Sequence, residues 1–97
     1  MDILQREAFA PRAHETFELA LGESSMTLTL TELKALPTTP APGLSRQPFA
    51  LTFRSASSIV LPQRLYRLVN ATMGPLDVFL VPVGRDPQGV VYQAVFN

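Results

Sequence analysis

The sequence predicts an all-β domain, namely a small antiparallel barrel or sandwich of six to seven short strands with a short N-terminal helix. Two observations lead to this prediction. Apolar and polar residues alternate over several short segments, as they do in half-buried strands. Turn-forming Gly, Pro, Asn and Ser residues separate these segments. The chain has 97 residues, so residues 1–97 are assigned to a single β domain.

The first eleven residues are predicted to form the short helix. Asp2 can act as its N-cap, and Pro11 is expected to end it because proline cannot continue a helix. A helix of this length is not stable alone. It must therefore pack against the rest of the domain.

The first hairpin is predicted from strict alternation on both sides of the turn at residues 22–25. Pairing Leu21 with Met26 places the large apolar side chains on one face and the threonines on the other. A slip by one residue would expose the whole apolar set, so this register is expected to be strongly specified. The apolar residues of this hairpin are Phe17, Leu19, Leu21, Met26, Leu28 and Leu30.

The middle of the chain begins with a proline-rich loop at residues 37–48. Such a loop can bind a partner, but a simple connection is favoured here. Three further strands are then expected: one over residues 49–54 with Phe49, Leu51 and Phe53 inward, a short one at residues 59–61, and one at residues 65–69.

Residues 76–97 are predicted to form the closing hairpin around a type I turn at Asp86–Gly89. Pairing Val83 with Val90 gives it two apolar faces. Pro82 cannot donate a ladder hydrogen bond, so it indicates an edge or a bulge. The face directed at the core is expected to hold Phe79, Val81, Val83, Val90, Tyr92, Ala94 and Phe96, and the outer face Val78, Leu80, Pro82, Val91, Gln93 and Val95.

A sheet needs only one buried face, so something must cover the second apolar face of this hairpin. The N-terminal helix or the curvature of the sheet is one answer. A protein partner or a second copy of the chain is the other, because monomers rarely expose large apolar patches. The candidate interface consists of Val78, Leu80, Val91 and Val95, with Arg64 at its rim.

The composition argues against several classes of partner. Eight basic residues balance eight acidic ones, which gives no electrostatic case for nucleic acid or an anionic membrane. The longest apolar run is far too short to cross a bilayer, and the N-terminal residues do not resemble a signal peptide. There is no cysteine, which is compatible with a reducing compartment. A cytoplasmic location is expected.

Catalysis is not predicted. His14 is the only histidine, and no nucleophile motif accompanies it. No spacing pairs two carboxylates for acid–base chemistry. Residues 84–89 superficially resemble a phosphate loop. They lack the Lys-Ser/Thr pair that ends such a loop, and a strand follows them where a phosphate loop has a helix. Asp77 is expected at the end of its strand, paired with Arg67 or hydrogen-bonded, because an unpaired buried charge is costly. No metal site or cofactor is expected.

Several segments resemble a small bacterial family known only as a domain of unknown function. Its members read L-P-Q-G-x-Y, then L-G-x-L-x-L-F-L-V-P-V-G, and end in Y-x-A-V-F-N. This chain departs from the pattern at Arg64, where the family has Gly, and at residues 70–71, where many members have His-Pro. The matching segments are Leu61–Gln63, Tyr66, Gly74, Phe79–Gly84 and Tyr92–Asn97.

The resemblance implies no catalytic residues, because the family has no established activity. Its members are similar to proteins found near phage-tail-collar-like or other surface-fibre proteins, which implies an accessory or assembly role. The function predicted is therefore a non-enzymatic interaction or assembly module, whose partner is another protein or a second copy. The alternative is a small barrel that binds a compact apolar ligand inside. Its lining would be Phe49, Phe53, Phe79, Tyr92 and Phe96.

Overall fold

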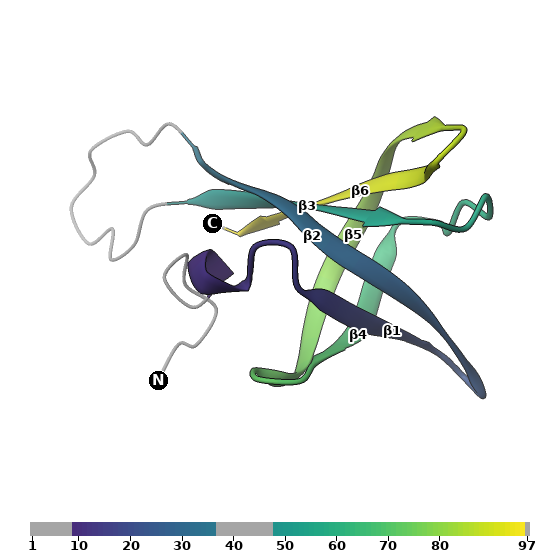
Figure 1. Cartoon of the computed structure of the whole chain (residues 1–97), viewed down its shortest axis with the longest axis horizontal. Coiled ribbons are helices and arrows are strands. Elements are labelled where there is room, and N and C mark those ends of the chain that lie inside the picture. The colour runs from purple at the N-terminus through teal and green to yellow at the C-terminus, as the bar shows by residue number, and fades with distance from the viewer. Residues whose placement is uncertain (1–8, 37–47, 97) are drawn as a thin grey trace.

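The computed structural model describes residues 9–36 and 48–96 of the chain. These residues form an antiparallel closed barrel of six strands (Figure 1). The all-β prediction is therefore confirmed, and of its two architectures the barrel is correct. The strands are β1 (Thr16–Leu21), β2 (Ser24–Ala35), β3 (Phe49–Ser55), β4 (Arg64–Asn70), β5 (Gly74–Asp86) and β6 (Gly89–Phe96).

The barrel is made of two three-stranded meanders, β1–β2–β3 and β4–β5–β6. The meanders join along β3–β6 by seven residue pairs and along β1–β4 by two, Glu18–Val69 and Leu19–Leu68. The middle strand of each meander carries a register shift, between Leu30 and Glu32 in β2 and between Pro82 and Gly84 in β5. Such bulges bend a strand and increase its twist, which helps a short sheet to close.

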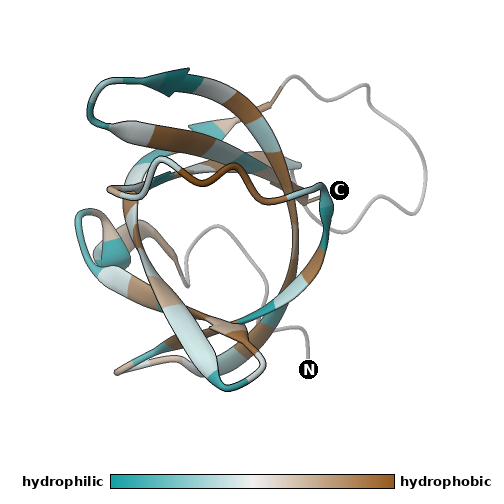
Figure 2. Ribbon diagram, turned by 90° about the vertical axis from the view of Figure 1, so that its right-hand side faces the viewer, coloured by the Kyte–Doolittle hydropathy of each residue, from teal (hydrophilic) through white to brown (hydrophobic). Residues whose placement is uncertain are grey.

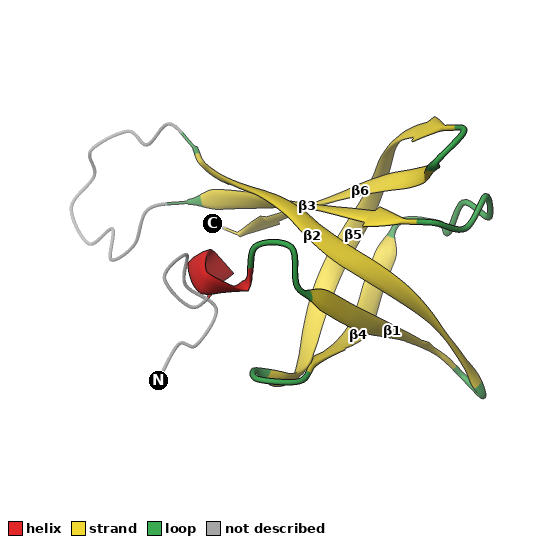
Figure 3. Ribbon diagram, in the orientation of Figure 1, coloured by secondary structure: helices red, strands yellow, loops and turns green. Residues whose placement is uncertain are grey.

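The connection from β3 to β4 crosses one end of the barrel, because these two strands lie opposite each other in the ring (Figure 2). Two tyrosines hold it there. The Tyr92 hydroxyl accepts a hydrogen bond from the Leu61 amide at 3.1 Å and donates one to the Ile59 carbonyl at 3.4 Å. The Tyr66 hydroxyl donates to the Pro62 carbonyl at 2.6 Å. The strand expected at residues 59–61 is thus wrong: this segment is a loop (Figure 3).

Three phenylalanines pack at the opposite end of the barrel. Phe49 begins β3 and Phe96 ends β6, and their rings stack with centroids 4.8 Å apart. Phe9 lies 5.9 Å from the first ring and 5.5 Å from the second, and it is fully buried. Burial of an aromatic ring is worth a few kcal/mol (~2–3). This contact ties the N-terminal segment to the barrel.

Most of the expected N-terminal helix lies outside the described residues. Within them, a short 3₁₀ turn spans Ala10–Arg12. Pro11 lies inside this turn. Its fixed φ suits the first turn, where the missing N–H has no partner to lose.

The first hairpin keeps the predicted face but has a shorter turn. Leu21 pairs with Ser24 instead of Met26, and Leu19 pairs with Met26. The two-residue turn begins at Gly22, whose φ of 68° is accessible to glycine at little cost. The register differs by two residues, and since side chains alternate with a period of two, the faces are unchanged. The buried apolar residues here are Phe17, Leu19, Leu28 and Leu30.

The proline-rich loop lies almost wholly outside the described residues, at 37–47. On its two sides the backbones of β2 and β3 continue to approach each other, because the Leu36 amide donates to the Pro48 carbonyl at 3.0 Å.

Within the described ranges, no helix is long and apolar enough to span a membrane.

The closing hairpin forms at the predicted turn but in a different register. Asp86 pairs with Gly89 and Gly84 with Val91, and after the bulge Pro82 pairs with Tyr92. Val83 is the extra residue. The predicted pairing of Val83 with Val90 is therefore wrong. Beyond the bulge, each residue of β5 pairs one position away from its predicted partner. The bulge indicated by Pro82 is confirmed, and it reverses which side chains of β5 face the core.

Candidate functional site on the outer face of the second meander

Two residues of the predicted interface lie in the core. Val78 is 2% exposed and Leu80 is fully buried. Their expected outward position is wrong because the bulge at Val83 shifts the β5–β6 register by one residue. On β6 the predicted inward face is confirmed, with Val90, Tyr92 and Ala94 buried. The outer face of the hairpin is still apolar, but β5 contributes other residues to it.

The side chains that β5 turns outward are those predicted to be core. Phe79 and Val83 are 50% and 55% exposed. β4 adds Leu65, which is 61% exposed, and β6 adds Val95, which is 50% exposed. We call these four residues the outer patch. Large apolar side chains left so open on a sheet face are typical of an interaction site when polar residues surround them.

The pairing of strands brings members of the outer patch together. Leu65 on β4 pairs directly with Phe79 on β5, and directly opposed residues of neighbouring strands have Cβ atoms about 5 Å apart. Val81 on β5 and Val91 on β6 are half-buried on the same outward side. The apolar surface therefore extends over all three strands of the second meander.

An ion pair borders the outer patch on β4 and β5. Arg67 pairs with Asp77 in the row next to Leu65 and Phe79, and the Arg67 Nε lies 3.1 Å from Asp77 Oδ1. The predicted pairing of these two residues is confirmed, and Asp77 lies near the beginning of β5 with its side chain exposed. Both side chains are more than half exposed, so the pair adds little stability. It gives the outer patch a polar rim.

The other three residues of the predicted interface, Val91, Val95 and Arg64, differ in how far their side chains are exposed. Val95 belongs to the outer patch, and Val91 is half-buried beside it. Arg64 is exposed at the start of β4, with its guanidinium 5.8 Å from the centre of the Tyr66 ring.

Burial raises the pKa of the Tyr66 hydroxyl. That hydroxyl is therefore protonated at neutral pH and able to donate to Pro62.

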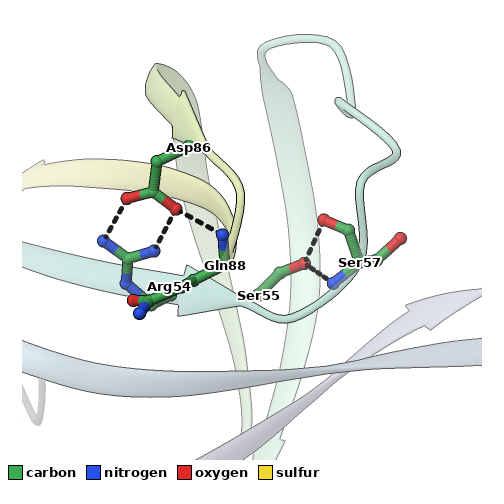
Figure 4. Close-up of polar contacts among 5 residues, drawn as sticks. All are labelled: Arg54, Ser55, Ser57, Asp86 and Gln88. Carbon is green, nitrogen blue, oxygen red and sulfur yellow. Dashed lines mark hydrogen bonds and ion pairs between the residues drawn. The ribbon is translucent and has the colours of Figure 1, made fainter.

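The turn of the closing hairpin is fixed by Asp86 (Figure 4). Its carboxylate accepts two hydrogen bonds from the Arg54 guanidinium, at 3.0 and 3.1 Å, and one from the Gln88 amide at 2.9 Å. The bonds from Arg54, and next the one from Gln88, lower the pKa of Asp86. Two parallel hydrogen bonds between an arginine and a carboxylate form a strong, geometrically specific pair. Residues 84–89 are thus a hairpin turn held by side chains, with Arg54 occupied by Asp86.

Asn70 has a structural role. It is buried, and its Oδ1 accepts hydrogen bonds from the Thr72 and Met73 amides. Its Nδ2 donates to Glu15 Oε1 and to the Thr16 carbonyl, both at 3.1 Å. The bonds to Oδ1 close the β4–β5 turn, and the bonds from Nδ2 join this turn to the start of β1. A buried amide whose donors and acceptors are satisfied in this way stabilises the fold.

The other residues that resemble the family pattern also serve the fold. Tyr66 and Tyr92 hold the loop that contains Leu61 and Pro62 across the barrel end. Gly74 has a φ of 76° in the β4–β5 turn, which a glycine adopts easily. These residues therefore have roles in the fold itself.

The interior that an apolar ligand would occupy is lined differently from the expectation. Phe79 points out of the barrel, so its assignment to an interior lining is wrong. Phe53 is fully buried and meets Phe17 edge-on, with centroids 5.3 Å apart. Tyr92 uses its hydroxyl on the β3–β4 loop. These rings pack against the protein itself.

Sequence reasoning missed Leu65, Phe79 and Val83 as surface residues. The available signal was the pair Pro82 and Gly84, since proline and glycine within a strand are each typical of a bulge. Applying a one-residue shift there would have turned Phe79 outward. A second signal was β4, where Leu65 alternates with Tyr66 and so cannot share its buried face.

Comparison with known proteins identifies the family alone. A family model described as "Domain of unknown function (DUF6916)" matches residues 4–96. No match was found among curated proteins, and none among solved structures. The chain belongs to this family of uncharacterised domains.

Proposed function

We propose that this member of the DUF6916 family is a non-enzymatic interaction module that binds another protein or a second copy of the chain through the outer patch. The observation that supports this function is the exposure of Leu65, Phe79, Val83 and Val95 on one outward face, while a full core is packed inside the barrel. Burial of half-exposed apolar side chains against a partner contributes roughly 25 cal/mol per Å² of apolar surface.

The arrangement of the outer patch has the anatomy of a protein interface. An aromatic ring, Phe79, lies between aliphatic neighbours, and the Arg67–Asp77 pair lies at the border. Interface centres are rich in aromatic residues, and their rims are polar. The specific form of this proposal is an accessory role in a phage-tail-like or surface-fibre assembly, which rests on the similarity of members of the resembled family to proteins found near such components.

Replacement of Phe79 by Glu tests the proposal. Phe79 is half exposed, so the variant should fold, while a charge at the centre of an apolar interface should weaken binding at least ~100-fold. Wild-type protein and the Phe79→Glu variant, tagged at the N-terminus, are used to capture proteins from a lysate of the native host. Sedimentation velocity of the purified proteins detects association between copies.

The matched control is Ala35→Glu, which places the same charge at an exposed position of β2, a strand that does not border β4, β5 or β6 along this face. Loss of a specific captured protein, or of a dimer, in Phe79→Glu but not in Ala35→Glu supports the proposal. If Phe79→Glu retains every association of the wild-type protein, or if wild-type protein has none, the outer patch is not a binding surface.

A further inference from the structure

The junction between β1 and β4, which closes the barrel, is short. Only Glu18–Val69 and Leu19–Leu68 pair across this junction. Continued in the same register, the ladder would pair Ala20 with Arg67, Leu21 with Tyr66 and Gly22 with Leu65. A hollow of about 360 Å³ lies there instead, lined by Ala20, Leu21, Gly22, Arg64, Leu65, Tyr66 and Arg67. We call this hollow the seam.

Each side of the seam is a strand edge. Ala20 and Leu21 pair with β2 on their other side, and Tyr66 and Arg67 pair with β5 on theirs. The edges that face the seam therefore have backbone groups free of ladder partners within the described residues. Unpaired edges are sites where an extended peptide can add as a strand. The volume of the seam falls within the range of ordinary ligand sites, at its lower end.

The charges around the seam favour an acidic occupant. Arg64 and Arg67 are the only charged residues that line it. Arg67 is held by Asp77, whereas Arg64 has no carboxylate partner in residues 9–36 and 48–96, and its guanidinium lies over the Tyr66 ring. Glu23 is in the adjacent turn but is not part of the lining. A carboxylate entering the seam would meet the fork of Arg64 donors.

We infer that the seam binds an extended peptide segment of a protein partner that carries an acidic side chain. The peptide backbone pairs with the edges of β1 and β4, and the carboxylate binds Arg64. This inference extends the proposed interaction role to a second site with a different chemistry. It shares only Leu65 with the outer patch, and the variants that test the two sites are different, so either one can fail without the other.

The test is a titration of ¹⁵N-labelled full-length protein with blocked pentapeptides that read Thr-Val-X-Val-Thr, in which X is Glu, Gln or Lys. The Glu peptide should shift the amide signals of Ala20, Leu21, Tyr66 and Arg67 in a saturable way. The Gln and Lys peptides should bind at least ~10-fold more weakly, which is the effect of losing a charged hydrogen-bonded pair. A peptide with Pro in place of both Val residues should not bind, because it lacks the amides that pair with a strand.

Two protein variants complete the test. Arg64→Gln should weaken binding of the Glu peptide at least ~10-fold, whereas Arg85→Gln, which removes an exposed arginine on β5 far along the strand from β4, should change it less than twofold. Absence of shifts at millimolar peptide, equal binding of the Glu and Lys peptides, or shifts away from the seam would overturn the inference. A peptide-free dimer with protected seam amides would assign the seam to a second copy and overturn it as well.

Discussion

Leu80→Glu is expected to unfold the protein. The side chain is fully buried between the packed strands, so the change removes an apolar core residue and places an unpaired carboxylate in the interior. The combined cost is at least ~4 kcal/mol, against a total stability of roughly 5–15 kcal/mol for a small domain. Circular dichroism during urea unfolding should show a lost or greatly lowered transition midpoint.

Phe79→Glu is the matched control for this prediction, since it makes the same substitution at the preceding residue. Phe79 is half exposed on the outer face, and the new charge reaches solvent. Its free energy of unfolding should stay within about 1 kcal/mol of the wild-type value. If Leu80→Glu folds normally and Phe79→Glu does not, β5 has the register of regular pairing without a bulge. Phe79 would then lie in the core, and the outer patch as defined here would be wrong.

Gly89→Ala is expected to have the second largest effect on stability. A Cβ at this position would lie 1.7 Å from the Ser55 carbonyl oxygen, and the φ of 140° is a conformation that residues with side chains rarely adopt. The obstacle is backbone, which cannot rotate away as a side chain can. The cost should be at least ~3 kcal/mol, measured as the change in free energy of unfolding in urea.

Gly84→Ala is the control for the glycine prediction. It lies on the same hairpin, and a Cβ there would meet nothing within 4 Å. Its stability should stay within ~0.5 kcal/mol of the wild-type value. A similar loss of stability at both positions would contradict this explanation, because it would show that the close approach of Gly89 to Ser55 is not the cause.

The sequence was sufficient to predict the parts of the fold that depend on alternation. Phe17 and Leu19 on β1, and Phe49, Leu51 and Phe53 on β3, are buried as predicted, because a period of two fixes the face of a strand even when its partner is misaligned. The turn at Asp86–Gly89 was also predictable, since Asp, Pro and Gly occupy the positions that favour it.

The candidate site was predicted only in outline, because a bulge changes the face of every residue beyond it. An apolar outer face on the closing hairpin was expected and exists, but Val78 and Leu80 exchanged places with Phe79 and Val83. Every one of these side chains is apolar, so hydrophobic pattern alone could not choose between the two registers. The seam between β1 and β4 was beyond prediction, since it depends on strands that are distant in the sequence.

The most direct test of the exposed face is the reactivity of single cysteines. The chain contains no cysteine, so Phe79→Cys, Val83→Cys, Val78→Cys and Leu80→Cys each introduce a unique thiol, and the rate of its reaction with a soluble disulfide reagent is measured. Thiols at 79 and 83 should react at the rate of a free thiol. Those at 78 and 80 should react at least ~100-fold more slowly, because they become accessible only on unfolding. Fast reaction at 78 and 80 with protection at 79 and 83 would contradict the account.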